Sequence, residues 1–243
     1  VYVPAVFAEY TTGRVLTMER LNGVKITDRA GLAALGVDRH ALAVTSAHVL
    51  LKTVFEDGFF YEGTGLRGES SLREVVAETG AVARMVPLES TYFGEGVAIV
   101  GDRIIQLTWR SHLGFVYEKS TFKRTGQFTY PTEGWGLAYD GDRLIMSDGS
   151  SYLYFLDPAT FERTGQVQVT GPDGPIARLN ELEYINGDLY ANIWRTDRIA
   201  RIEPATGKLL AWLELEGILA PEDRTGDEDV LNGIAYDPAT EHL

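Results

Sequence analysis

The chain has 243 residues, of which 44% are hydrophobic and 26 are glycine, a composition that suits one large β domain or two smaller ones. Its formal net charge of −13 argues against nucleic acid or an anionic membrane as the main partner, and no apolar run approaches the roughly 20 residues needed to span a bilayer. It has no cysteine, which excludes disulfides, thiolate metal sites and cysteine nucleophiles.

The charge is unevenly distributed along the chain. Residues 1–60 carry six Lys/Arg and six Asp/Glu, whereas residues 61–243 carry 16 basic and 29 acidic residues and all four tryptophans. The entire net charge therefore lies in the second part. This asymmetry predicts two segments of different origin, 1–57 and 58–243.

The first segment is predicted to be a short α/β, mostly helical piece. Residues 15–18 indicate a strand, and Asn22-Gly23 indicates a tight turn after it. Asp28 caps a short helix that ends near Gly36, and Asp38 begins a longer helix with one apolar face.

Residues 10–26 resemble the hinge region of the AarF/UbiB-type atypical kinases, and the helices that follow also match that family, up to residues 54–60. In that family a His-Ala-Asp catalytic loop would follow, but here Tyr61-Glu62-Gly63 follows, and the nucleotide-binding Lys and both functional Asp residues are missing. The resemblance therefore implies at most an adenine-facing hinge at Met18 and Glu19, without kinase activity.

The second segment contains a repeat of short strands. Gly-Asp hairpin turns at Gly101, Gly141 and Gly187 are 40 and 46 residues apart, and a second turn follows each of them, at 118–121, 157–160 and 203–206. Four strands in each period are typical of a propeller blade. A β-sandwich is the alternative, but a sandwich does not require this periodicity.

The repeats indicate how many blades to expect. A partial unit covers about 58–88, complete units cover about 93–130, 134–170 and 178–216, and another opens at Asp229 and supplies one strand. The sequence thus predicts a mainly β chain that forms an incomplete five-bladed propeller of about four blades plus one strand.

Glu95 is the main candidate for chemistry. It lies between Gly94 and Gly96, behind Tyr92 and Phe93, at the start of an apolar run. Aromatic neighbours that exclude water would raise its pKa toward the range useful for proton transfer. The alternative is a solvated Glu where a strand begins at a glycine turn.

The repeat places other side chains beside Glu95. Glu95 and Trp135 each lie six residues before a Gly-Asp turn, Asn180 lies seven before the next, and Asn232 begins the corresponding strand of the fifth unit. Trp109 and Trp194 reach the same end of the blades from the neighbouring strands. We expect these side chains to line one mouth of the central channel, although tryptophans in propellers also serve as packing between blades.

Other motifs carry weaker signals. The glycine-rich string 63–68 lacks the βαβ context of a dinucleotide site, residues 147–149 have no histidine partner for a catalytic triad, and the four histidines lack metal-ligand spacing. The acidic loop of Asp223, Asp227, Glu228 and Asp229 has the oxygen ligands that a structural calcium ion needs, but a solvated turn fits its spacing better.

Several motifs together resemble the glutaminyl-peptide cyclotransferases of the plant and bacterial type. They are Tyr61–Gly68, Phe93–Gly96, Glu133–Leu137, Arg178–Gly187, Ala191–Trp194 and Asp229–Ala235, so the resemblance runs from about residue 58 onward. It implies a five-bladed propeller, in agreement with the count from the repeats.

The resemblance also implies a function: an aminoacyltransferase that closes the N-terminal Gln of peptides or proteins into pyroglutamate and releases ammonia. Glu95 matches the catalytic acid/base of the family. Phe93, Trp109, Trp135 and Trp194 match its aromatic pocket, Asn180 matches a polar contact to substrate, and Asn232 joins them by position. No metal or organic cofactor is implied. The family favours a secreted or periplasmic location, but the chain shows no signal-peptide pattern, so the compartment stays open.

Two departures accompany the resemblance. The family's Phe-Thr-Gln-Gly-Leu segment is replaced here by the kinase-like residues 49–53, and its Gly-Lys-Leu-Trp-Pro segment does not appear. Both segments supply donors to the substrate carbonyl, and one lost donor costs about 10²–10³ in rate.

We therefore interpret the chain as a fusion at Asp57–Phe60. The alternative function is a peptide-binding or scaffold module without turnover.

Overall fold

The computed structural model describes residues 59–76, 79–219 and 230–236. The chain divides into two units, Val1–Gly58 and Phe59–Leu243, and every described residue belongs to the second. The strand, turn and helices predicted for 1–57 lie outside the described residues. The described residues contain no helix, and therefore no helix that could cross a membrane.

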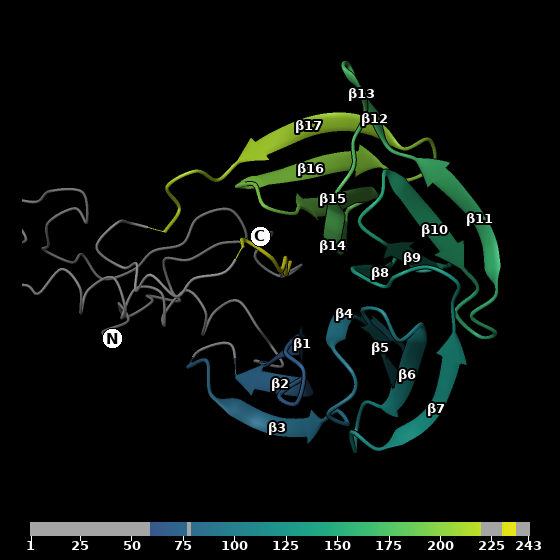
Figure 1. Ribbon diagram of the computed structural model, residues 1–243, viewed down its shortest axis with the longest axis vertical. Coiled ribbons are helices and arrows are strands. Elements are labelled where there is room, and N and C mark those ends of the chain that lie inside the picture. The colour runs from purple at the N-terminus through teal and green to yellow at the C-terminus, as the bar shows by residue number, and fades with distance from the viewer. Residues whose placement is uncertain (1–58, 77–78, 220–229, 237–243) are drawn as a thin grey trace, which may run out of the picture. The chain divides into compact units, whose positions relative to one another are not determined.

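The described residues form four sheets (Figure 1). The first contains β1 (Phe59–Thr64), β2 (Ser71–Val76) and β3 (Val82–Pro87), and the second contains β4 (Gly94–Val100), β5 (Arg103–Thr108), β6 (Leu113–Glu118) and β7 (Arg124–Thr129). The third contains β8 (Leu137–Tyr139), β9 (Leu144–Ser147), β10 (Tyr152–Leu156) and β11 (Arg163–Gln168). The fourth contains β14 (Leu179–Ile185), β15 (Asp188–Ile193), β16 (Arg198–Glu203) and β17 (Lys208–Glu214), extended by the short hairpin β12 (Thr170–Gly171) and β13 (Gly174–Pro175).

The sheets have the arrangement of propeller blades. Consecutive long strands pair antiparallel within each sheet, and β4 packs beside β8, which packs beside β14. Figure 1 shows these strands near a common centre and β3, β7, β11 and β17 on the outside. The predicted mainly β propeller is therefore confirmed with four blades. The predicted hairpins are confirmed too, and Gly101, Gly141 and Gly187 each have the positive φ that such turns need.

The first sheet contains the second, third and fourth strands of a blade. In β1 and β2, the Thr64 hydroxyl bonds both the N–H and the carbonyl of Ser71, and in β5 and β6 Thr108 does the same with Leu113. Hence β1 corresponds to β5, and the innermost strand of this blade is not among the described residues. The sequence reading saw only that the first unit was partial.

The fifth unit differs from its predicted strand. Residues 230–236 take part in no strand ladder among the described residues. Side chains of the fourth blade hold them instead: the N–H of Gly233 donates to Asn192 Oδ1 (3.0 Å) and that of Ile234 to Glu181 Oε2 (2.9 Å). An innermost strand normally forms its ladder with the next strand of its own blade, and no such strand is described here.

The core consists of three apolar clusters, each between two neighbouring sheets. Successive side chains of a strand point to opposite faces, so adjacent residues join different clusters. Ile104 faces the first sheet while Ile105 faces the third, and on β9 Leu144 and Ile145 divide in the same way. Each buried Ile or Leu contributes about 1.5–3 kcal/mol, which makes blade-to-blade packing the main source of stability.

Glycine permits the innermost strands to come close. A Cβ atom on Gly96 would lie 2.6 Å from the backbone N of Leu137 and 2.7 Å from the carbonyl O of Trp135. The N–H of Gly96 donates to that same carbonyl (2.7 Å). Gly136 repeats the arrangement against the backbone of Asn180. These contacts fix the spacing at the heads of β4, β8 and β14.

We expect Gly96→Ala to lower the free energy of unfolding by about 1–3 kcal/mol, because the added methyl group would overlap backbone atoms that have little room to move. Urea unfolding followed by circular dichroism measures the change. Gly126→Ala on β7 is the control, since its Cβ would meet only Val116, at 3.7 Å. Equal midpoints for the two variants would contradict this account of the packing.

Candidate active site

A β-bulge at the start of β4 positions Glu95. Gly94 pairs with Thr108 and Val97 pairs with Gln106, so Glu95 and Gly96 together oppose a single residue of β5. A bulge releases its residues from the regular ladder and re-aims their side chains. Glu95 thereby lies at the head of an innermost strand, with β8 close behind Gly96.

The same irregularity recurs in the other blades. On β14, Leu179 pairs with Ile193 and Leu182 with Ala191, which leaves Asn180 and Glu181 in the bulge. In the third blade the N–H of Trp135 donates to Ser147 O (3.0 Å), just before the ladder of β8 begins. Glu95, Trp135 and Asn180 therefore occupy equivalent positions.

Aromatic side chains lie around these positions in two pairs. The rings of Phe93 and Trp109 are 5.4 Å apart, and the N–H of Trp109 donates to Phe93 O (3.0 Å). The rings of Trp135 and Trp194 are 5.5 Å apart and nearly perpendicular. Such tilted and edge-to-face contacts are favourable geometries for aromatic pairs.

Glu133 joins the two aromatic pairs. Its Oε2 accepts hydrogen bonds from Nε1 of Trp109 (2.7 Å) and Nε1 of Trp135 (3.0 Å), and its Oε1 accepts from Nε of Arg110 (2.9 Å). Burial acts to raise the pKa of Glu133, but the hydrogen bonds from Trp135, Arg110 and Trp109 outweigh it and lower the pKa below its usual value. Glu133 is therefore an anion at neutral pH that holds both indoles in place.

Glu95 has the opposite electrostatic character. Its half-buried carboxyl forms no hydrogen bond with any described residue. Burial first, and the negative charge of Glu133 second, raise the pKa of Glu95 to about 8. Two neighbouring carboxyls with pKa values pushed apart are a recurrent arrangement for acid/base chemistry, with Glu95 as the group that exchanges protons.

The two predicted carboxamides lie in different surroundings. Asn180 is buried at the head of β14, where its backbone carbonyl accepts a hydrogen bond from Ser147 Oγ (2.6 Å), and its side-chain amide bonds no other described residue. Asn232 is exposed, and within the described ranges no hydrogen bond or ring contact joins it to the aromatic pairs. The structure thus brings together Phe93, Glu95, Trp109, Trp135 and Trp194, with Asn180 at the equivalent position one blade further on.

The sequence reading gave no role to Glu133, Glu181 or Glu183. Burial and then the charge of Glu183 raise the pKa of Glu181 well above its usual range, and burial raises the pKa of Glu183 to about 7. Their separation by one residue in a predicted strand was a usable signal, because it puts both carboxyls on one face. Glu133 had no comparable signal, since two of its three donors, Trp109 and Arg110, lie more than 20 residues away in the sequence.

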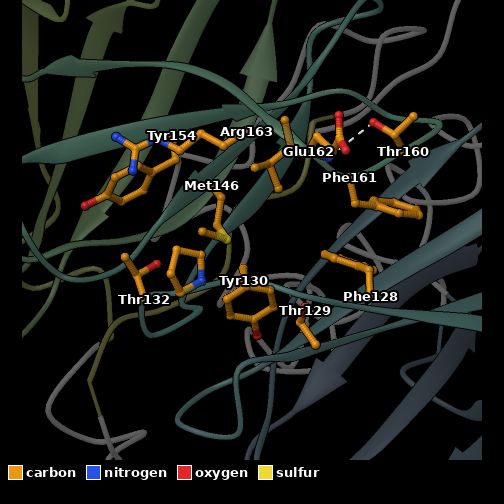
Figure 2. Close-up of a pocket in the computed structure, with 12 residues that line it drawn as sticks. Phe128, Thr129, Tyr130, Thr132, Met146, Tyr154, Thr160, Phe161, Glu162 and Arg163 are labelled. Atoms are coloured by element: carbon orange, nitrogen blue, oxygen red, sulfur yellow. Dashed lines mark hydrogen bonds between the residues drawn. The ribbon is translucent and has the colours of Figure 1, made fainter.

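A cavity of about 420 Å³ lies elsewhere, between the second and third blades. Figure 2 shows its walls, which are formed by residues 128–132, Met146, Tyr154, Leu156 and residues 160–163. None of the predicted site residues lines it. Two of its residues connect it to the site: the Tyr130 hydroxyl accepts a hydrogen bond from the N–H of Thr108 (2.9 Å), beside Trp109, and Thr132 directly precedes Glu133.

No group of three or more potential metal ligands lies together in the described part of the chain. The acidic loop considered for calcium lies outside that part, because residues 220–229 are not described.

The fold and this site define a β-propeller protein with a half-buried carboxyl at a cluster of aromatic side chains. The glutamine cyclotransferase family model matches residues 52–243, and the chain belongs to that family. A glutaminyl-peptide cyclotransferase from Arabidopsis thaliana is 41% identical over 186 residues, which are 75% of this chain and 58% of the plant protein. The chain thus spans well under two thirds of the length of this relative.

A solved structure agrees with the family. The crystal structure of Myxococcus xanthus glutaminyl cyclase matches with a TM-score of 0.69 and 36% identity, and the match covers 76% of this chain and 79% of that chain. The resemblance inferred from the motifs is confirmed.

The N-terminal resemblance is confirmed as well. Residues 1–62 match the ABC1 atypical kinase-like domain, so this match and the cyclotransferase match overlap at 52–62. A probable protein kinase UbiB from Tolumonas auensis is 43% identical over 60 residues, which are 25% of this chain and only 11% of that protein.

The raised pKa of Glu95 makes a prediction about stability. A carboxyl with a folded-state pKa of about 8, against 4.5 when unfolded, binds more protons in the folded state between these values, so stability falls as pH rises from 4.5 to 8. Glu95→Gln removes this loss. We expect the free energy of unfolding of the variant to rise by about 1–3 kcal/mol relative to that of the wild type over this pH range. This is less than the full pKa shift implies, because water still reaches the half-buried carboxyl.

Urea unfolding at pH 4.5, 6 and 8 measures this gain. Glu216→Gln, which changes an exposed carboxyl after β17, is the control and should show a constant difference from the wild type. A constant difference for Glu95→Gln as well would mean that Glu95 has an ordinary pKa.

Proposed function

We propose that this chain converts the N-terminal glutamine of peptides into pyroglutamate and releases ammonia, with Glu95 as the group that moves the proton. The observation that carries the proposal is the carboxyl of Glu95, which has a pKa of about 8 and lies near Glu133, the carboxylate that holds Trp109 and Trp135, in a chain of this family. The relatives named above are a glutaminyl-peptide cyclotransferase and a glutaminyl cyclase.

The chemistry requires one proton to move twice. The α-amine of the substrate attacks its own side-chain carbonyl carbon, a C–N bond forms, and the amine gives a proton to Glu95. Glu95 then returns the proton to the side-chain nitrogen as the original C–N bond breaks, so that ammonia leaves. An α-amine has a pKa of about 7.7–8.0, close to the value of about 8 for Glu95, so the amine becomes a free nucleophile at the same pH at which Glu95 can accept its proton.

The remaining task is orientation. Ring closure is intramolecular, so holding the amine near the carbonyl carbon supplies much of the acceleration. In this proposal the pair Phe93–Trp109 and the pair Trp135–Trp194 hold the glutamine side chain and exclude water from Glu95. The side-chain amide of Asn180, which bonds no other described residue, is available to the substrate. Each step uses only a carboxyl group and the substrate itself, so no cofactor enters the proposed reaction.

The proposal extends to the fold. The hydrogen bonds from Gly233 and Ile234 to side chains of β14 and β15 support residues 230–236 as the innermost strand of a fifth blade. The overlap of the two family matches at 52–62 supports a junction between two families near Asp57–Phe60.

We expect kcat/KM for ammonia release from a Gln-initiated dipeptide to rise with pH and to level off above about pH 8. Below that pH Glu95 is protonated and cannot accept the proton, and the substrate amine is protonated and cannot attack; above it both groups are in their reactive forms. Mass spectrometry of the peptide confirms ring closure.

Glu95→Gln should lower the rate by about 10²–10⁴, the range for loss of a general acid/base. Glu216→Gln is the control and should keep the wild-type rate. Release of ammonia by Glu95→Gln at the wild-type rate would overturn the role of Glu95. Peptide binding without any product from the folded wild type would favour a binding module over an enzyme.

A further inference from the structure

Two blades present a tryptophan followed by an arginine at equivalent positions. Trp109 and Arg110 follow β5, and Trp194 and Arg195 follow β15. In each pair the guanidinium carbon lies over the indole, at 3.9 Å for Arg110 and 4.3 Å for Arg195. Each tryptophan also donates its backbone N–H to the residue that precedes the innermost strand, Trp109 to Phe93 O and Trp194 to Arg178 O.

The two pairs differ in how their charge is balanced. The guanidinium of Arg110 forms an ion pair with Glu133, with Nε 2.9 Å from Oε1. Within the described ranges the guanidinium groups of Arg195 and Arg178 form no ion pair and no hydrogen bond, and Asp197 nearby pairs with neither. Arg195 over Trp194, and Arg178, whose backbone carbonyl accepts the Trp194 N–H, are therefore exposed cations without a carboxylate partner among the described residues, in a chain whose net charge is −13.

The backbone supports a special role for these arginines. Arg178 has φ 66° and Arg195 has φ 62°, both in the left-handed region, which is uncommon for a residue with a long side chain. Six described non-glycine residues have positive φ, and two of them adjoin Trp194. Arg178 accepts the backbone N–H of Trp194, and Arg195 follows Trp194 in the chain. A left-handed conformation costs energy in a residue other than glycine, and residues held in it cluster at functional sites.

Trp194 connects the arginines to the candidate active site. Its ring packs edge-on against Trp135, whose Nε1 donates to Glu133, the carboxylate whose charge acts on Glu95. The Trp194 ring therefore lies between Trp135 and Arg195. A peptide with its N-terminal glutamine at Glu95 would reach Arg195 with residues that follow the glutamine.

We propose that Arg195, supported by Arg178 on the segment that bonds the backbone of Trp194, forms a carboxylate-binding subsite for the part of the peptide that follows the N-terminal glutamine. This inference rests on the proposed function. The carboxylate is supplied by an acidic side chain or by the C-terminus of a short peptide. A guanidinium fixed over an indole presents its donors to a carboxylate in a planar, bidentate geometry.

The test compares matched peptides in ammonia release. Gln-Glu-Ala-amide against Gln-Gln-Ala-amide tests an acidic side chain, and Gln-Ala-Ala with a free C-terminus against its amide tests the terminal carboxylate. We expect the carboxylate peptide to have about a 2- to 5-fold higher kcat/KM in at least one comparison, which is the range for an exposed ion pair. The difference should lie in KM and should shrink at high salt.

Arg195→Gln should abolish this preference while leaving kcat for the amide peptides unchanged, and Arg178→Gln should reduce it. Lys123→Gln, in the turn between β6 and β7, makes the same change of charge at the other end of a blade and should keep the preference. Equal kcat/KM for carboxylate and amide peptides in both comparisons would overturn the subsite but leave the proposed function intact.

A binding experiment separates the subsite from turnover. Tryptophan fluorescence titrations of Glu95→Gln and of the double variant Glu95→Gln/Arg195→Gln measure the affinity for the same peptides without reaction. Tighter binding of the carboxylate peptides that Arg195→Gln abolishes would support the subsite even if the wild type released no ammonia. Equal affinities in all titrations would overturn it.

Discussion

The close approach of innermost strands at glycine is the constraint on which the rest of the structure depends. Gly96 lets β4 contact the backbone before β8, and Gly136 does the same for β8 against β14. A side chain at either position would separate the strand heads where the bulges lie. The distances between Glu95, Trp135 and Asn180 are therefore set by backbone packing, and the apolar clusters between the blades hold that packing in place.

The two carboxyls near the strand heads illustrate how position decides chemistry. Glu133 receives three hydrogen bonds and stays ionised, whereas Glu95 receives none from the described residues and is desolvated, with a pKa of about 8. Glu133 fixes two indole groups through these bonds, and its negative charge adds to the burial that raises the pKa of Glu95. An anion that positions its neighbours thus raises the pKa of the carboxyl that exchanges protons.

Much of the fold could be predicted from the sequence because the Gly-Asp turns mark a period that only repeated blades explain. The equivalence of Glu95, Trp135 and Asn180 followed from counting back from those turns, and the bulges on β4 and β14 give the same register. The described residues contain no innermost strand beside β1, and the sequence alone showed only that the first unit was partial, because a second strand of a blade has the same alternation as a first one. The role of Glu133 depends on donors that only the folded chain brings together.

The central claim is that Glu95 is a carboxyl with a pKa matched to that of a substrate amine. The most direct test is a ¹³C NMR titration of the side-chain carboxyls in protein labelled at glutamate, with Glu95→Gln to assign the resonance. We expect the Glu95 carboxyl to titrate near pH 8, and at lower pH in Glu133→Gln because the neighbouring negative charge is gone. A resonance that titrates near 4.5 in both proteins would contradict the account.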